Sequence, residues 1–195
     1  QNIIGEHVGS QDQVSAAFGG FNRIEFRRND SFEVAPIILP RERIAELQSH
    51  LMLFFTGFSR IASTVAESKI QNFRNRKAEL ERMGEMVDDA VRVLQSPGSA
   101  IGEFGELLHE GWTLKRRLSD KVSTAEIDSI YENAMKAGAT GGKILGAGGG
   151  GFLVLFVKPE LQGSVREALK NLIHVPFAFE DSGSRVVLYQ PDGIS

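Results

Sequence analysis

The stretch GATGGKILGAGGGGFLVLFV, residues 138–157, decides how this sequence is assigned to a fold. It places eight glycines within fourteen residues, from Gly138 to Gly151, and the apolar run Phe152–Val157 directly after them. An apolar run of this length predicts a buried strand. Glycine costs conformational entropy on folding, so such a run indicates a backbone that takes unusual dihedral angles or approaches a ligand closely. A turn that only lets a helix and a strand pack tightly is the alternative explanation.

Two well-known phosphate-binding motifs do not fit these glycines. Residues 146–151 match the pattern G-x-G-x-x-G, but the dinucleotide-binding motif follows a strand and opens a helix. Here the sequence predicts a helix before the glycines and a strand after them. A Walker A loop needs Ser or Thr after its lysine, whereas Lys143 is followed by Ile144.

The sequence around the glycines predicts a mixture of helices and strands. We expect a hairpin at residues 21–38 and strands at 51–55, 152–157, 175–179 and 185–190. We expect helices at 11–18, from 40, at 58–94 with a bend near 71–79, at 99–118, at 123–138 behind a Ser123/Glu126 capping box, and at 159–172. The strand at 51–55 is wholly apolar, which predicts burial on both faces. This order predicts an α+β fold, with helices on one face of an antiparallel sheet.

Composition excludes several classes of protein. The chain has 195 residues, of which 42% are hydrophobic and 24% are charged, and its net charge is −3. This is the composition of a folded chain, and a pI near 5.9 argues against nucleic acid as a partner. The chain has no cysteine, which excludes disulfides, thiolate zinc sites and cysteine nucleophiles. The four histidines share no ligand spacing, so we expect no metal site built from them.

The location and extent of the protein are also open to prediction. The longest apolar run is far shorter than the ~20 residues that span a bilayer, and no signal peptide is visible. We therefore expect a cytoplasmic protein without a membrane partner, in keeping with the lack of cysteine. The chain begins with Gln1 rather than Met, and we expect further polypeptide upstream of it. A homo-oligomer is compatible with the sequence, which does not fix the oligomeric state.

A second polar motif, GSQDQ at residues 9–13, precedes small residues that predict the start of a helix. The carboxylate of Asp12 could accept a proton from a substrate hydroxyl, as in phosphoryl transfer. It could equally cap the helix, because Asp is a favoured N-cap residue. The spacing alone leaves both roles open.

Together, the two motifs resemble those of the galactokinase, homoserine kinase, mevalonate kinase and phosphomevalonate kinase superfamily, the GHMP kinases. Residues 9–13, with Phe18-Gly-Gly20 after them, are similar to its G-x-x-D-Q segment, and residues 142–152 look like its third, glycine-rich motif. The two motifs lie about 130 residues apart, in the superfamily's order. The stretches QDQVSAAFGGFN at 11–22, TGFSR at 56–60, WTLK at 112–115 and IY at 130–131 resemble the branch that phosphorylates heptose 7-phosphate and related bacterial sugars.

The resemblance implies a domain arrangement. Residues 1–45 would complete an N-terminal ATP-binding domain, and residues 46–195 would form a ferredoxin-like C-terminal domain. The superfamily's second motif, P-x-x-x-G-L-G-S-S, which wraps the ATP phosphates, does not occur in this chain, and neither does its N-terminal sugar-binding motif. The missing N-terminal half of the same enzyme is therefore an implied partner, and the chain is expected to be inactive alone.

The resemblance also implies a reaction, the ATP-dependent phosphorylation of D-glycero-D-manno-heptose 7-phosphate to the 1,7-bisphosphate. Asp12 would orient or deprotonate the sugar hydroxyl, with Gln11 and Gln13 beside it as substrate-binding residues. Mg²⁺ would bridge phosphate oxygens, with ligands in the missing part and none assigned here. The glycine loop would turn backbone N–H groups toward the phosphates or the substrate; it consists of Gly146, Ala147, Gly148, Gly149, Gly150 and Gly151.

Three cationic residues are candidates for anion contacts. Arg60 follows a strand end and would reach the sugar phosphate, or it is a surface arginine. Lys115 could attract the 7-phosphate, or it belongs to a solvated helix face. Lys143 precedes the glycine loop and either binds an anion or caps the preceding helix.

Two other functions are compatible with the sequence. One is a non-catalytic small-molecule-binding or regulatory α+β module of the same fold, and the other is a purely structural domain. Asp12 followed by Gln13 favours the kinase, because a module needs no carboxylate at that place. The missing phosphate loop favours the module for this chain in isolation.

Overall fold

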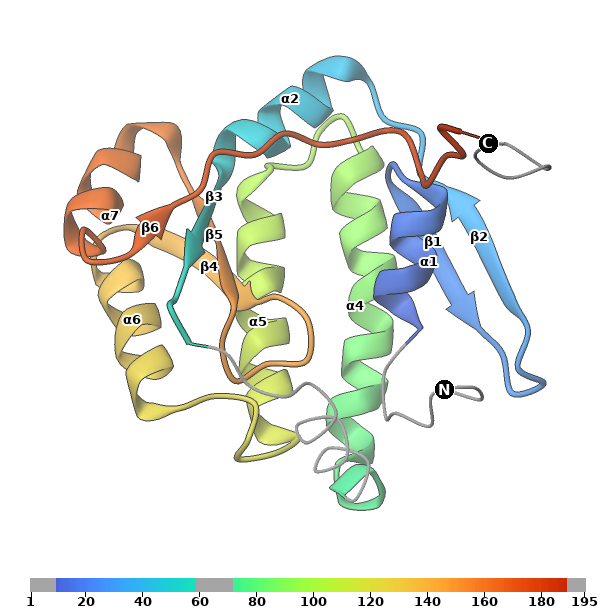
Figure 1. The fold of residues 1–195 in the computed structure, drawn as a ribbon, viewed down its shortest axis with the longest axis horizontal. Coiled ribbons are helices and arrows are strands. Elements are labelled where there is room, and N and C mark those ends of the chain that lie inside the picture. The colour runs from blue at the N-terminus through green and yellow to red at the C-terminus, as the bar shows by residue number, and fades with distance from the viewer. Residues whose placement is uncertain (1–9, 59–71, 189–195) are drawn as a thin grey trace, which may run out of the picture. The chain divides into compact units, whose positions relative to one another are not determined.

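A computed structural model describes residues 10–58 and 72–188 of the chain (Figure 1). These residues form two compact units, residues 39–178 and residues 10–38 with 179–188. The end of the described chain therefore belongs with its beginning, whereas the sequence groups it with the C-terminal domain. The assignment of residues 1–45 and 46–195 to two kinase domains stays a prediction.

The larger unit is built on a four-stranded antiparallel sheet. Its strands are β3 (Leu51–Phe55), β4 (Ala139–Ile144), β5 (Phe152–Val157) and β6 (Ile173–His174), in the order β4-β5-β3-β6. Between β3 and β4 the described chain forms η1 (Phe73–Asn75), α4 (Lys77–Gln95), α5 (Gly102–Arg117) and α6 (Ala125–Lys136). η2 (Pro159–Leu161) and α7 (Gln162–Ala168) connect β5 to β6, and α2 (Arg41–His50) precedes β3. This β-α-β-β-α-β order with this sheet is ferredoxin-like, so the α+β prediction is confirmed.

Side-chain alternation buries one face of the sheet completely. Met52 and Phe54 of β3, with Leu153 and Leu155 of β5, are at most 1% exposed. They share an apolar cluster with residues of α6 and α7, which lie on one side of the sheet in Figure 1. The cluster members from these two helices are Ile127, Tyr131, Ala134 and Val165, followed by Leu169 just after α7.

The opposite face of β3 is less covered. Leu51 and Leu53 are half-buried there, and Phe55 is exposed. The prediction that this strand is buried on both faces is therefore wrong. Successive side chains point to opposite faces, and antiparallel sheets commonly have one face more solvated than the other.

The sequence does not predict β4, because its residues ATGGKI lack the branched and aromatic side chains typical of strands. Two of its glycines allow very close packing. A Cβ on Gly141 would lie 1.9 Å from the carbonyl oxygen of Gly105 in α5, and one on Gly142 would lie 2.4 Å from that of Val154 in β5. The first part of the glycine run thus serves packing. A strand, not a helix, precedes the glycine loop, but since no helix follows it the dinucleotide motif stays excluded.

The end of the larger unit also differs from the prediction. β6 covers only Ile173–His174, and residues 175–188 form no strand, whereas the sequence predicts strands at 175–179 and 185–190. The N–H of Val175 still donates to the carbonyl of Leu53 at 2.8 Å. Beyond it the chain turns away to join the smaller unit, so apolar residues that look like strands have no neighbouring strand to pair with.

The helices of the described chain begin and end close to the positions predicted from the sequence, with small changes. Thr124 rather than Ser123 caps α6, since its Oγ1 accepts from the N–H of Ile127 at 3.2 Å. The Ser123 hydroxyl donates instead to Asp128 at 2.6 Å. α7 ends at Ala168 rather than near 172. The predicted helical stretch that begins at 58 lies largely outside the described residues.

The smaller unit joins both ends of the described chain. α1 (Gln11–Phe18) leads into an antiparallel hairpin of β1 (Asn22–Phe26) and β2 (Phe32–Pro36), as predicted. Residues 179–184 pack on the end of α1, where the N–H of Ser184 donates to the carbonyl of Ala16 at 3.0 Å. A Cβ on Gly183 would lie 1.9 Å from the carbonyl oxygen of Ala17, so the contact requires glycine.

Candidate functional site

The glycine loop connects β4 to β5 in the larger unit. Each of its glycines, at positions 146 and 148–151, has a positive φ between +68° and +149°, a region that other residues avoid. Two positions are also closed sterically. A Cβ on Gly148 would lie 2.8 Å from the carbonyl oxygen of Val122, and one on Gly150 would lie 2.5 Å from that of Phe58. This loop therefore needs its glycines for both conformation and space.

The start and middle of the loop are fixed by the region of α5 and α6. The Nζ of Lys115, in the last turn of α5, donates to the carbonyl of Gly146 at 2.7 Å. The N–H of Gly149 donates to the carbonyl of Val122 at 2.8 Å. Val122 lies between the two helices and is fully buried, so this second anchor is part of the core.

The end of the loop is fixed by the residues that follow β3. The N–H of Gly151 donates to the carbonyl of Phe58 at 2.8 Å. The carbonyl of Gly151 accepts two hydrogen bonds, from the N–H and from the hydroxyl of Thr56, both at 2.9 Å. Thr56 is one of two buried polar side chains in the described chain, with 4% exposure. The sequence assigns no role to it.

Several N–H groups of the loop remain available. Within the described residues, those of Gly146, Gly148 and Gly150 donate no hydrogen bond. Gly150 is itself buried, and a buried N–H without a partner is costly. Successive N–H groups in such turns form concave anion-binding sites. The loop is thus suited to bind phosphate oxygens.

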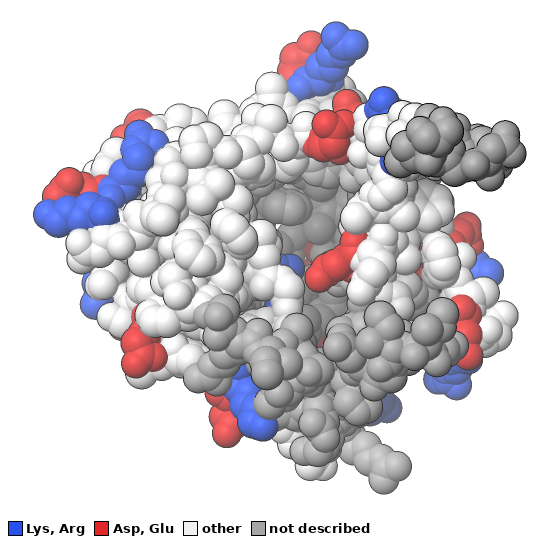
Figure 2. All heavy atoms as spheres, viewed as in Figure 1, with Lys and Arg blue, Asp and Glu red and all other residues white. Residues whose placement is uncertain are grey.

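The structure brings one predicted cation to this loop. Lys115 contacts its first glycine and uses one of three ammonium donors there. Lys143 lies inside β4, half-buried and opposite Val154 of β5, and its role stays a prediction. Arg60 lies outside the described residues. On the face drawn in Figure 2, acidic and basic residues are intermingled rather than gathered by sign.

The candidate base belongs to the smaller unit. Asp12 is exposed in the first turn of α1, between the exposed Gln11 and Gln13. Ser10 occupies the N-cap position, so the structure does not support the capping role for Asp12. Within the described residues its carboxylate makes no hydrogen bond or ion pair. A negative charge in the first turn interacts favourably with the helix dipole.

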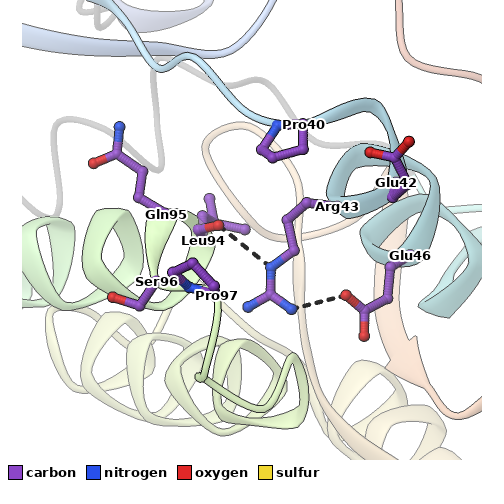
Figure 3. A pocket seen from close by; sticks show the side chains of 8 residues that line it. All are labelled: Pro40, Glu42, Arg43, Glu46, Leu94, Gln95, Ser96 and Pro97. Carbon is purple, nitrogen blue, oxygen red and sulfur yellow. Dashed lines mark hydrogen bonds and ion pairs between the residues drawn. The ribbon is translucent and has the colours of Figure 1, made fainter.

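A surface pocket of about 390 Å³ lies in the larger unit, away from the glycine loop in sequence (Figure 3). Its centre is Arg43 of α2, which donates to the carbonyls of Val93, Leu94 and Ser99 at 2.6, 3.3 and 3.0 Å. The first two are among the terminal carbonyls of α4, which lack partners inside the helix. Arg43 therefore connects α2 to the end of α4. These hydrogen bonds account for the polar residue at the centre of the pocket without a ligand.

A buried tyrosine lies beneath β4. The hydroxyl of Tyr131 in α6 is 2.8 Å from Nδ1 of His109 in α5. Burial raises the pKa of Tyr131 to about 12, while Arg116 and the backbone of Gly142 oppose that rise. The hydroxyl therefore stays protonated and joins α6 to α5 through His109.

Across residues 10–58 and 72–188, no three His, Cys, Asp or Glu side chains lie together so as to hold a metal ion. Mg²⁺ in phosphoryl-transfer sites needs only one or two carboxylates beside phosphate and water. No helix of the described chain is long and apolar enough to cross a bilayer.

Comparison with known proteins assigns the chain to a family. Residues 66–174, more than half of the chain, match the family described as GHMP kinases C terminal. The D-glycero-alpha-D-manno-heptose 7-phosphate kinase of Campylobacter jejuni is 35% identical over 84% of this chain and 48% of its own length. The chain belongs to the GHMP kinase family, as the resemblance implies.

Solved structures of related kinases support the same family and fold. A D-glycero-D-manno-heptose 1-phosphate kinase from Bacteroides thetaiotaomicron is 31% identical and superposes with a TM-score of 0.60, over 90% of this chain and 47% of that one. A Leishmania major mevalonate kinase in complex with R-mevalonate is 20% identical, with a TM-score of 0.65 over 90% of this chain and 53% of that one, which shows the fold alone. The chain spans about half the length of these relatives.

Proposed function

We propose that this chain is the C-terminal part of an ATP-dependent sugar-phosphate kinase. The observation that carries the proposal is its 35% identity with the Campylobacter jejuni heptose 7-phosphate kinase over 84% of the chain. The anchored glycine loop with its unpartnered N–H groups gives that similarity a physical basis. We propose D-glycero-D-manno-heptose 7-phosphate as the substrate and its 1,7-bisphosphate as the product.

In the proposed reaction Asp12 accepts the proton of the sugar hydroxyl while that oxygen bonds to the γ-phosphorus and the bond to ADP breaks. Bound Mg-ATP would supply the phosphoryl group and the metal charge. The N–H groups of Gly148 and Gly150 would bind phosphate oxygens, and the ammonium of Lys115 adds positive charge beside them. Gln11, Gln13, Arg60 and Lys143 are proposed to contact the substrate or its phosphates.

The proposed partner is the N-terminal half of the same enzyme. The chain spans about half of its relatives, at 47–48% of their lengths for the two heptose phosphate kinases. The smaller unit also exposes large apolar side chains that a further polypeptide would cover. Val14 is its one buried apolar residue in the described chain, while Phe18, Ile38, Val186 and Val187 are 52–96% exposed. We therefore propose inactivity of the chain alone.

The names of the relatives disagree about the sugar, since one is a heptose 7-phosphate kinase and the other a heptose 1-phosphate kinase. The experiment is ADP release from Mg-ATP with each heptose phosphate, L-fucose, galactose and mevalonate. It uses the longest natural polypeptide that contains this chain. Turnover with the 7-phosphate alone supports the proposal. Turnover only with another acceptor would correct the substrate, and no turnover with any acceptor would favour a non-catalytic module.

A further inference from the structure

The strongest unassigned feature of the molecule is the buried hydroxyl of Thr56. The Thr56 side chain is only 4% exposed, and its hydroxyl donates a hydrogen bond to the backbone carbonyl of Gly151. It sits beside the glycine loop, although the core at that place could be filled by an apolar residue of the same shape. The Thr56 hydroxyl joins the end of β3 to the last residue of the glycine loop, which indicates a positional role.

The geometry points to Thr56 as the positioning residue of the glycine loop. We infer that its hydroxyl fixes the carbonyl of Gly151 and so sets the direction in which the N–H group of Gly150 points. This deepens the proposed function and rests on it only for what the loop binds.

Three contacts make this clamp rigid. Thr56 contributes both its N–H and its hydroxyl to the same carbonyl, at 2.9 Å each. Phe58 accepts from the N–H of Gly151 at 2.8 Å, so the residue is held on both its donor and its acceptor. Gly57, with φ +77°, makes the tight turn that lets both neighbours reach the loop. The hydroxyl also lies 3.4 Å from the N–H of Phe58, which closes the turn.

The clamp acts directly on the available N–H group of Gly150. Gly150 is adjacent to the clamped residue, and its Cα faces the carbonyl of Phe58 so closely that a Cβ would come within 2.5 Å. Any loosening between Thr56 and Gly151 therefore changes the place of Gly150 against Phe58. The second anchor, from Gly149 to the buried carbonyl of Val122, fixes the other side, so the segment between the two anchors has little freedom.

The test compares Thr56→Val with Thr56→Ser in the longest natural polypeptide that contains this chain, by NMR-detected amide exchange. Valine keeps the shape and removes the hydroxyl, whereas serine keeps the hydroxyl. We expect the amides of Gly149 and Gly151 to exchange about fivefold to tenfold faster in Thr56→Val, the effect of one lost hydrogen bond. Thr56→Ser is expected to exchange at the wild-type rate.

A variant that destabilises the same unit elsewhere separates positioning from general stability. Val165 in α7 is fully buried, and Val165→Ala is expected to lower the melting temperature while leaving the relative exchange of the two glycine amides unchanged. Unchanged exchange in Thr56→Val, or equal acceleration in the serine or Val165→Ala variants, would overturn the inference.

A second readout uses the longest natural polypeptide with Mg-ATP and heptose 7-phosphate. We expect kcat to fall at least about tenfold in Thr56→Val, as for displaced transition-state donors, and to recover in Thr56→Ser. Equal kcat in wild type and Thr56→Val would overturn the link to catalysis. If wild type itself has no turnover, the proposed function fails, while amide exchange still decides the role of Thr56.

Discussion

The substitution Gly141→Ala tests whether the first part of the glycine run is structural. The added Cβ would lie 1.9 Å from the carbonyl oxygen of Gly105 and 2.8 Å from the N of His109, both backbone atoms of α5. Separations under 3.0 Å essentially never occur for a real Cβ, so strand and helix must part by about 1.1 Å. A radial gap of about 0.5–1 Å already forfeits a quarter to a half of each dispersion contact.

The cost of that separation follows from overpacking. Inserted methyl groups in packed cores typically cost about 1–3 kcal/mol, and more where the backbone has to move. We therefore expect a loss of about 3 kcal/mol. For a protein of this size each kcal/mol lowers the melting temperature by roughly 2–4 °C, so Gly141→Ala should melt about 6–12 °C below wild type.

The assay is thermal unfolding followed by far-UV circular dichroism, with Gly163→Ala as the matched control. Gly163 lies in α7, and a Cβ there would meet nothing within 4 Å. Alanine is the better helix former by about 1 kcal/mol, so the control should melt at or above the wild-type temperature. A Gly141→Ala protein that melts within about 2 °C of wild type would refute the packing argument.

Three further predictions follow from the same structure. Gly146→Ala places a Cβ in open space at φ +68°, so it should cost only about 1 kcal/mol of stability yet lower kcat/KM about tenfold by turning the loop; equal losses in Gly163→Ala would contradict this. Arg43→Ala removes the hydrogen bonds to the end of α4 and should cost about 2–3 kcal/mol in urea unfolding, against less than about 0.5 for its exposed neighbour in Arg41→Ala. Burial raises the pKa of Tyr131 from 10.0 to about 12. The contribution of the protonated Tyr131 side chain to folding stability is therefore complete below pH 10 and is lost as the pH rises through 12. Unfolding free energy should fall less steeply across that range in Tyr131→Phe, and identical slopes would contradict the assignment.

The sequence predicted those elements whose signal is local. The periodic apolar residues of α4 to α6, the apolar runs of β3 and β5 and the hairpin turn around Asp30 each carry their own pattern. The order of these elements was sufficient for the α+β assignment. The family motifs gave Asp12 and the glycine loop as site residues, whose roles stay predictions.

What the sequence missed depends on contacts between distant residues. β4 forms because Gly141 and Gly142 let it lie against α5 and β5, and no local propensity signals that. Thr56 is 95 residues from its partner carbonyl, so no spacing rule could connect them. Residues 175–188 have the composition of strands but no adjacent strand, because pairing is a property of neighbours rather than of sequence alone.

We propose Asp12 as the base of a kinase whose C-terminal part is this chain. The most direct measurement is kcat with D-glycero-D-manno-heptose 7-phosphate for wild type, Asp12→Asn and the control Asp30→Asn, each in the longest natural polypeptide containing this chain. Asp30 is an exposed turn residue at φ +61°, a conformation that asparagine also tolerates. We expect Asp12→Asn to lower kcat by roughly 10²–10⁴-fold with ATP affinity unchanged, while Asp30→Asn turns over like wild type. Turnover by Asp12→Asn at a rate near that of wild type would contradict it.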